Sequence, residues 1–189
     1  MDEKVITEDE KEEDLLSVEE RQLLDQTEVR EEDAAQFPQE LIVESPEELT
    51  SERRQNLHQM ILKMSIPQKI HLAMLGNREA RKLLIHDRNK VISTAVLRSP
   101  KLTDSEIIRL AEEKSTPGDV ILTICKRRTW LKKYHIKLAL VNNPKTPLSK
   151  AIQFLDHLHD KDLQALSRNK SISTVLSQSA WNVLRKRKV

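Results

Sequence analysis

The chain of 189 residues contains only two glycines, Gly76 and Gly118. β-Hairpin turns, β-bulges and phosphate-binding loops depend on glycine, because it adopts backbone conformations that other residues avoid. So small a number argues against a β-rich fold and against a dinucleotide-binding or P-loop site. Aromatic residues are equally scarce, with two Phe, one Tyr and two Trp. We therefore expect a core of Leu, Ile, Val and Ala, as in packed helices.

Cysteine and long apolar runs are also nearly absent. The single cysteine, Cys125, cannot form an internal disulfide, which excludes the disulfide framework of a small secreted domain. The first residues lack the basic and then apolar stretches of a signal peptide. No apolar run approaches the roughly 18 residues that suggest a membrane span. We therefore expect a cytoplasmic protein that makes no use of a membrane.

The charge is divided unevenly between the two ends of the chain, although the net charge is only +2. Residues 1–50 hold 19 acidic and 4 basic side chains, a net charge of −15. Residues 51–189 hold the remaining 11 acidic and 28 basic side chains, a net charge of +17. Such asymmetry predicts an acidic tail attached to a basic domain.

Residues 1–44 combine dense negative charge with isolated apolar pairs. Ordering such a segment buries little apolar surface against the conformational entropy that it loses. We therefore expect residues 1–44 to form a mostly disordered acidic tail, with a transient helix after the capping-box pattern Ser17–Glu20. The one apolar cluster of the tail is the segment Phe37–Val43. It fits either a docking motif or a stray apolar patch in a linker.

Helix start signals recur from residue 45 onward and predict a basic helical domain over residues 45–189. Each signal places a Ser or Thr before a proline of the first helical turn, or three positions before an acidic or amide residue. They lie at 45–48, 65–68, 103–106, 116–119 and 146–147. Apolar residues follow helical spacing between them, which predicts short helices of about 10–14 residues.

Part of this domain repeats. Residues 95–103 align with residues 139–147 at a shift of 44 residues, and residues 89–94 echo residues 169–174. Pro100 and Pro144 end the helices before them, because the residue before a proline avoids the α conformation. Units of roughly 42–44 residues are typical of helical solenoids, and they are clearest from residue 66 onward.

The corner after Ala139, with Asn-Pro-Lys-Thr-Pro at 143–147, resembles that of bacterial leucine-rich-repeat-variant proteins and, more loosely, HEAT and armadillo repeats. The resemblance covers residues 66–189 at most. It implies an all-α, right-handed solenoid of stacked helices with a scaffold or binding role and no shared catalytic residues. The iron–sulfur cluster of the founding variant requires several cysteines, so it is not expected with Cys125 alone.

The sharpest candidate site is the segment 126–134, in which five basic residues alternate with two aromatic ones. Cations beside aromatic rings contact phosphates and stack on nucleic-acid bases. The alternative is a corner between helices, with the rings packed inside and the charges in solvent. The candidate residues for binding a polyanion or a partner are Lys126, Arg127, Arg128, Trp130, Lys132, Lys133 and Tyr134.

Further basic residues recur at matching places of the repeats. Lys90, the Arg127–Arg128 pair, Arg168 and Lys170 are expected just before or at the start of a repeat's first helix, along one edge of the solenoid. Helix N-termini at that edge favour anions. The alternative is a charged rim that only keeps the solenoid soluble.

We expect no enzyme, no cofactor and no metal site. The sequence shows no Ser/His/Asp set, no paired-carboxylate motif and no zinc spacing, and His157 and His159 point to different sides of a helix. The main hypothesis is a non-enzymatic scaffold that binds a protein partner, with an autoinhibitory acidic tail. The alternative is a nucleic-acid-binding module that uses the basic edge, whose affinity would fall steeply with salt.

Overall fold

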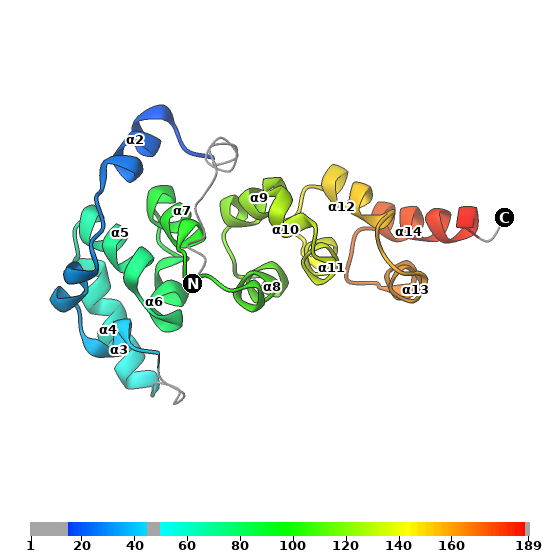
Figure 1. Ribbon diagram of the computed structural model, residues 1–189. Coiled ribbons are helices and arrows are strands. Elements are labelled where there is room, and N and C mark those ends of the chain that lie inside the picture. The colour runs from blue at the N-terminus through cyan, green and yellow to red at the C-terminus, as the bar shows by residue number, and fades with distance from the viewer. Residues whose placement is uncertain (1–14, 45–49, 188–189) are drawn as a thin grey trace. The chain divides into compact units, whose positions relative to one another are not determined.

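The computed structural model describes residues 15–44 and 50–187, and all regular structure in these ranges is helical (Figure 1). The all-α fold class predicted from the sequence is thereby confirmed. None of the described helices is long and apolar enough to cross a membrane. Two expectations lie outside the described residues, namely residues 1–14 of the acidic tail and the helix start at 45–48.

The chain divides after Leu102 into two compact units. This boundary differs from the one that we predicted between residues 44 and 45. The described acidic residues pack against helices that follow them in the chain, so they belong to the first unit.

The first unit is organised around one central helix. This unit contains α2 (Val18–Gln26), the 3-10 helix η1 (Glu31–Gln36), α3 (Gln39–Ile42), α4 (Ser51–Lys63), α5 (Ile66–Leu75), α6 (Arg78–Leu84) and α7 (Lys90–Arg98). Helix α5 packs against α6, α7, η1 and α3. Its Ile70, Leu72 and Ala73 are buried, which places α5 in the core of the unit.

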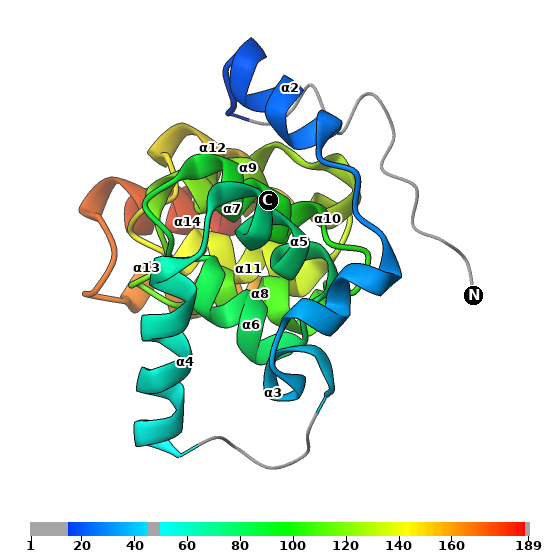
Figure 2. The ribbon, with the colours of Figure 1, turned by 90° about the vertical axis from the view of Figure 1, so that its left-hand side faces the viewer.

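Residues 15–44, which we call the acidic segment, differ from the disordered tail that we predicted. They run along the outside of the unit, with α2 against α7, η1 against α5, and α3 against α5 and α6 (Figure 1 and Figure 2). Leu24, Phe37 and Leu41 are buried there. A segment of low apolar content becomes ordered in this way because its few apolar residues meet a surface that other helices have already built, which offsets part of the lost conformational entropy.

The second unit consists of α8 (Asp104–Glu112), α9 (Gly118–Lys126), α10 (Arg128–Leu131), α11 (Tyr134–Asn142), α12 (Leu148–Leu155), α13 (Asp160–Arg168) and α14 (Thr174–Arg187). Helix α11 packs against α8, α10 and α12, and α14 packs against α12 and α13. The core is aliphatic, as predicted, with fully buried side chains from Ile107, Ile121, Ile124, Ile136, Leu140 and Leu155.

The capping boxes of three helices form as the sequence predicts. The side chains of Ser17, Ser65 and Thr103 each accept a hydrogen bond from the backbone N–H three positions later. The side chain of that later residue accepts a hydrogen bond from the backbone N–H of the capping residue. Helices α9 and α12 instead begin after a proline that has no side-chain capping bond. Thr116 and Thr146, the caps predicted for these two helices, are buried.

The main repeat alignment matches the boundaries of the helices. Helix α11 begins and ends 44 residues after α7, and α12 begins 44 residues after α8. Buried residues also correspond, as Ile92 does to Ile136 and Val96 does to Leu140. The second echo does not match, because Asn89 precedes the start of α7 whereas Asn169 follows the end of α13.

Candidate binding site

The predicted basic segment 126–134 turns both of its aromatic rings toward the protein. Trp130 is only 2% exposed, and the guanidinium carbon of Arg127 lies 4.4 Å from the centroid of its ring. Arg127 is itself buried, so this cation–π contact is shielded from water and stabilises the corner between α9 and α10. Stacking of Trp130 on a nucleic-acid base would require this corner to open.

Tyr134 is held by residues at the start of α13. Its ring stacks on that of His159 with the centroids 4.2 Å apart, and its hydroxyl donates to Asp162. The same hydroxyl accepts a hydrogen bond of 3.0 Å from the backbone N–H of His159. Burial and the hydrogen bond to Asp162 raise the pKa of Tyr134. The aromatic residues of the segment therefore pack within the second unit, as the alternative interpretation of a helix corner described.

The cations of this segment are placed differently from one another. Lys126, Arg128 and Lys132 are exposed at the end of α9 and along α10, whereas Lys133 pairs with Asp104 of α8. Arg127 is buried and Lys133 is paired, so Lys126, Arg128 and Lys132 are the three cations of the segment that an external anion could contact.

The other predicted basic residues do not share one position in the repeat. Lys90 is the first residue of α7, in the first unit. Arg168 is the last residue of α13, and Lys170 lies in the turn that follows. Arg168 therefore does not lie just before or at the start of a helix, as we expected, whereas Lys170 lies in the turn that leads to α14.

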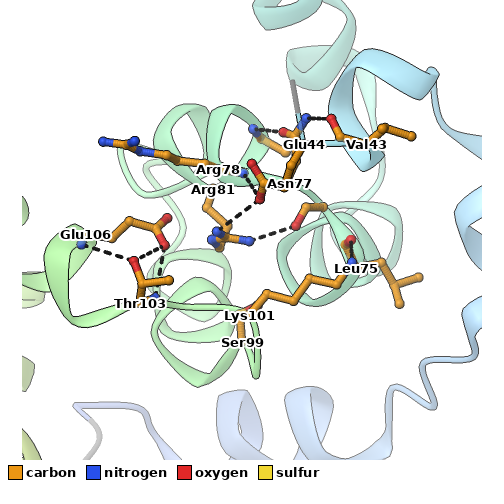
Figure 3. Close-up of polar contacts among 12 residues, drawn as sticks. Val43, Glu44, Leu75, Asn77, Arg78, Arg81, Ser99, Lys101, Thr103 and Glu106 are labelled. Carbon is orange, nitrogen blue, oxygen red and sulfur yellow. Dashed lines mark hydrogen bonds and ion pairs between the residues drawn. The ribbon is translucent and has the colours of Figure 1, made fainter. Parts of the chain in front are cut away.

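A second group of contacts, which we did not predict, surrounds the corner between α5 and α6 (Figure 3). Asn77 is buried at this corner and binds main-chain carbonyls of the acidic segment. Its backbone N–H donates to the carbonyl of Leu41 at 2.7 Å, and its Nδ2 donates to the carbonyls of Glu40 and Val43, each at 2.7 Å. Its Oδ1 accepts from the N–H of Ala80 at 3.0 Å, which fixes the orientation of the amide.

Arg81 and Arg78 bind the end of the same segment. Arg81 is 3% exposed, and one of its guanidinium nitrogens donates to the carbonyl of Gly76 at 2.8 Å. Another nitrogen of Arg81 lies 3.6 Å from the carboxylate of Glu44, which also accepts a 3.0 Å hydrogen bond from the backbone N–H of Arg78. Neutral and charged donors thus converge on residues 40–44.

Gly76 lets the acidic segment approach closely. A Cβ at this position would lie 3.2 Å from the carbonyl oxygen of Leu41 and 2.4 Å from that of Leu72. Any side chain here would therefore collide with α5 and press against α3. Scarcity of glycine and the Asn that follows Gly76 are the sequence signals that could have drawn attention to this corner.

Two further corners donate to main-chain carbonyls in the same way. At the first, Ser99 and Lys101 donate to the carbonyls of Met74 and Leu75, which end α5. At the second, Nδ2 of Asn143 donates to the carbonyls of Ala111 and Glu113 at 2.8 and 3.2 Å, and Lys145 donates to those of Ser115 and Thr116. We call these two and the corner at Asn77 the carbonyl-binding corners. Lys101 and Lys145 stand 44 residues apart, which is the shift of the predicted repeat.

Ion pairs add to the contacts of the acidic segment. A carboxylate oxygen of Asp25 lies 2.7 Å from a guanidinium nitrogen of the buried Arg98. A carboxylate oxygen of Asp33 lies 3.5 Å from Nδ1 of His71. Glu40 pairs with Arg53, and the hydrogen bond from Arg53 holds the pKa of Glu40 below its ordinary value. Carboxylates of the acidic segment are thereby matched by the cations of Arg53 on α4 and Arg98 on α7 and by the imidazole of His71 on α5.

These features define an all-α protein of short packed helices whose corners bind main-chain carbonyls. Comparisons with protein-family models, with curated proteins and with solved structures find no match for the chain. The likeness to leucine-rich-repeat-variant proteins, which covers residues 66–189 at most, therefore remains a resemblance.

Proposed function

We propose that the chain is a non-enzymatic helical-repeat scaffold that binds a protein partner. The observation that carries this proposal is the way in which the first unit holds residues 37–44. Apolar anchors, main-chain carbonyls and carboxylates are each matched by a partner group, which is the combination used where a folded domain binds an extended or helical peptide. A surface built in this way suits protein segments more than small molecules.

The repeats support a solenoid architecture for this scaffold. Helices α7 and α11 begin 44 residues apart in the chain, as do α8 and α12, and buried residues and corner lysines recur at the same shift. We infer that successive repeats of about 44 residues stack in a right-handed solenoid. Repeat arrays of this kind present extended surfaces to partners.

Binding of nucleic acid is the second candidate function, because Lys126, Arg128 and Lys132 are exposed close together in sequence. Packing of Trp130 and Tyr134 removes base stacking from this hypothesis and leaves only contacts with phosphates. Neutralising three phosphates would make the logarithm of the affinity fall by about 2.7 for each tenfold rise in salt. Such binding would be weak and independent of base sequence.

Capture on the tagged full-length protein, with and without nuclease and at low and high salt, separates these functions. A protein that is retained after nuclease treatment and at high salt is the expected result. An eluate that consists mainly of nucleic acid, and that disappears when Lys126, Arg128 and Lys132 are replaced by Glu, would refute the proposal. The matched control replaces three exposed lysines elsewhere, Lys63, Lys114 and Lys161, by Glu.

A further inference from the structure

We propose that the corner between α5 and α6 recognises an acidic peptide segment with apolar anchors, and that residues 37–44 of the chain itself occupy this corner in the absence of a partner. The inference rests on the proposed function, since it names the surface and the chemistry of the partner. It also gives the acidic segment a regulatory role, because the partner has to displace it.

Two side chains anchor the resident segment. Phe37 and Leu41 are four residues apart, and both are buried, Leu41 completely. Leu41 belongs to α3, which packs against α5 and α6, and Phe37 directly follows η1, which packs against α5. Val43, two residues beyond, is 59% exposed, which shows that burial is restricted to the anchor positions. Burying a leucine is a large part of what a short peptide can contribute to affinity.

Most hydrogen bonds from the corner go to main-chain groups of the segment rather than to its side chains. Asn77 binds three carbonyls, those of residues 40, 41 and 43, and any residue type supplies a carbonyl. These carbonyls are available because they close the short helix α3, whose last carbonyl groups have no partner within the helix. The corner therefore fits a segment that ends in one helical turn.

The positive charges of the corner favour a ligand that carries carboxylates. Arg81 is buried beside the position of the Glu44 carboxylate, and Arg53 binds Glu40. A buried guanidinium disfavours an apolar or cationic group next to it. The partner segment is thus expected to carry an aromatic residue, a leucine four positions later and a carboxylate three positions after the leucine.

Tethering accounts for the occupancy of the corner by a segment with so few anchors. The pair of Arg53 and Glu40 is exposed, and exposed ion pairs contribute little. The segment belongs to the same chain as the corner, however, and a covalent tether can hold a binding segment at a local concentration in the millimolar range. A free partner then competes against this local concentration, and only a partner with better anchors or with further contacts displaces the segment.

Cutting the connection tests the proposal on the complete chain. A protease site replaces residues 45–49, and the protein is compared before and after cleavage. The probe is a fluorescein-labelled synthetic peptide of residues 30–44, and its binding is followed by fluorescence anisotropy. We expect the probe to bind the cleaved protein and to bind the intact protein at least tenfold more weakly, because the tethered segment competes with it.

Variants of the probe test the anchors without altering the fold of the protein. Leu41→Ala in the probe is expected to weaken binding to the cleaved protein at least tenfold. Glu44→Gln is expected to weaken it about threefold to fivefold, since the Glu44 side chain is 62% exposed and an ion pair in solvent contributes little. The matched control is Glu32→Gln, which removes the same charge from an exposed position of the same segment and should change affinity less than twofold.

Three results would overturn the proposal. They are failure of the probe to bind the cleaved protein, equal binding of the Leu41→Ala probe and the parent probe, and loss of helical circular dichroism by residues 50–189 once the cut segment has been separated. The last result would make the segment an integral part of the fold. None of these results depends on capture of a partner, so failure of this inference and failure of the proposed function are distinguishable.

Discussion

Replacing Asn143 by Ala is expected to destabilise the protein by about 2–4 kcal/mol. The side chain is 4% exposed, donates to the carbonyls of Ala111 and Glu113, and accepts a 2.9 Å hydrogen bond from the backbone N–H of Lys145. An intramolecular hydrogen bond contributes about 0.5–1.5 kcal/mol, and a buried polar group left without a partner costs about 1–3 kcal/mol. Two donated bonds and one accepted bond, of which part is replaced by water, give the expected range.

The neighbouring residue supplies the control. Asn142 is exposed and donates only within its own helix, to the carbonyl of Leu138 at 2.9 Å. Asn142→Ala should therefore change the free energy of unfolding by no more than about 0.5 kcal/mol. Asn143→Asp should destabilise more than Asn143→Ala does, because it turns a carboxylate toward two carbonyl oxygens.

Urea denaturation followed by far-UV circular dichroism measures these differences. Fluorescence of the buried Trp130, in a Trp181→Phe background, reports on the second unit alone. If Asn143→Ala and Asn142→Ala were equally stable, the carbonyl contacts of this corner would not hold the helices together, and the structural role assigned to the corners would be wrong.

Three further predictions concern the second unit. Leu155→Ala removes a fully buried side chain and should cost about 2–5 kcal/mol in urea denaturation, whereas a cost below about 1 kcal/mol would contradict its place in the core. Burial raises the pKa of Cys125 to about 11, so the thiol should resist a disulfide reagent in the folded protein and react once urea unfolds it; fast reaction of the native protein would disprove the burial. Tyr134 is the one tyrosine of the chain, so near-UV absorbance follows its ionisation directly, and Asp162→Asn should lower its pKa, because the carboxylate holds the proton on the hydroxyl. An unchanged titration would exclude that contact.

Features set by neighbouring residues could be predicted from the sequence. The capping boxes at Ser17, Ser65 and Thr103 depend on two residues three positions apart, and all three form. The 44-residue shift also matches the helix boundaries, because Pro100 and Pro144, which are 44 residues apart, each follow the end of a helix.

Contacts between distant residues could not be predicted in this way. The bond between Asn77 and the carbonyl of Glu40 joins residues 37 positions apart, and no local pattern announces it. The segment 37–43 was therefore compatible with both docking and a linker. Composition was also ambiguous at residues 126–134, because a cation beside a tryptophan fits a nucleic-acid surface as well as a buried pair such as Arg127 and Trp130.

The carbonyl-binding corners have a consequence for how such a chain can change over time. Their donors are particular side chains, but their acceptors are peptide carbonyls, which every amino acid carries. Substitutions at Ala111, Glu113, Leu75 or Leu41 leave the accepting atom in place as long as the helix ends at the same point. The hydrogen bond itself therefore sets no requirement on the type of the accepting residue, and only the burial of its side chain, as at Leu41 and Ala111, restricts what can stand there.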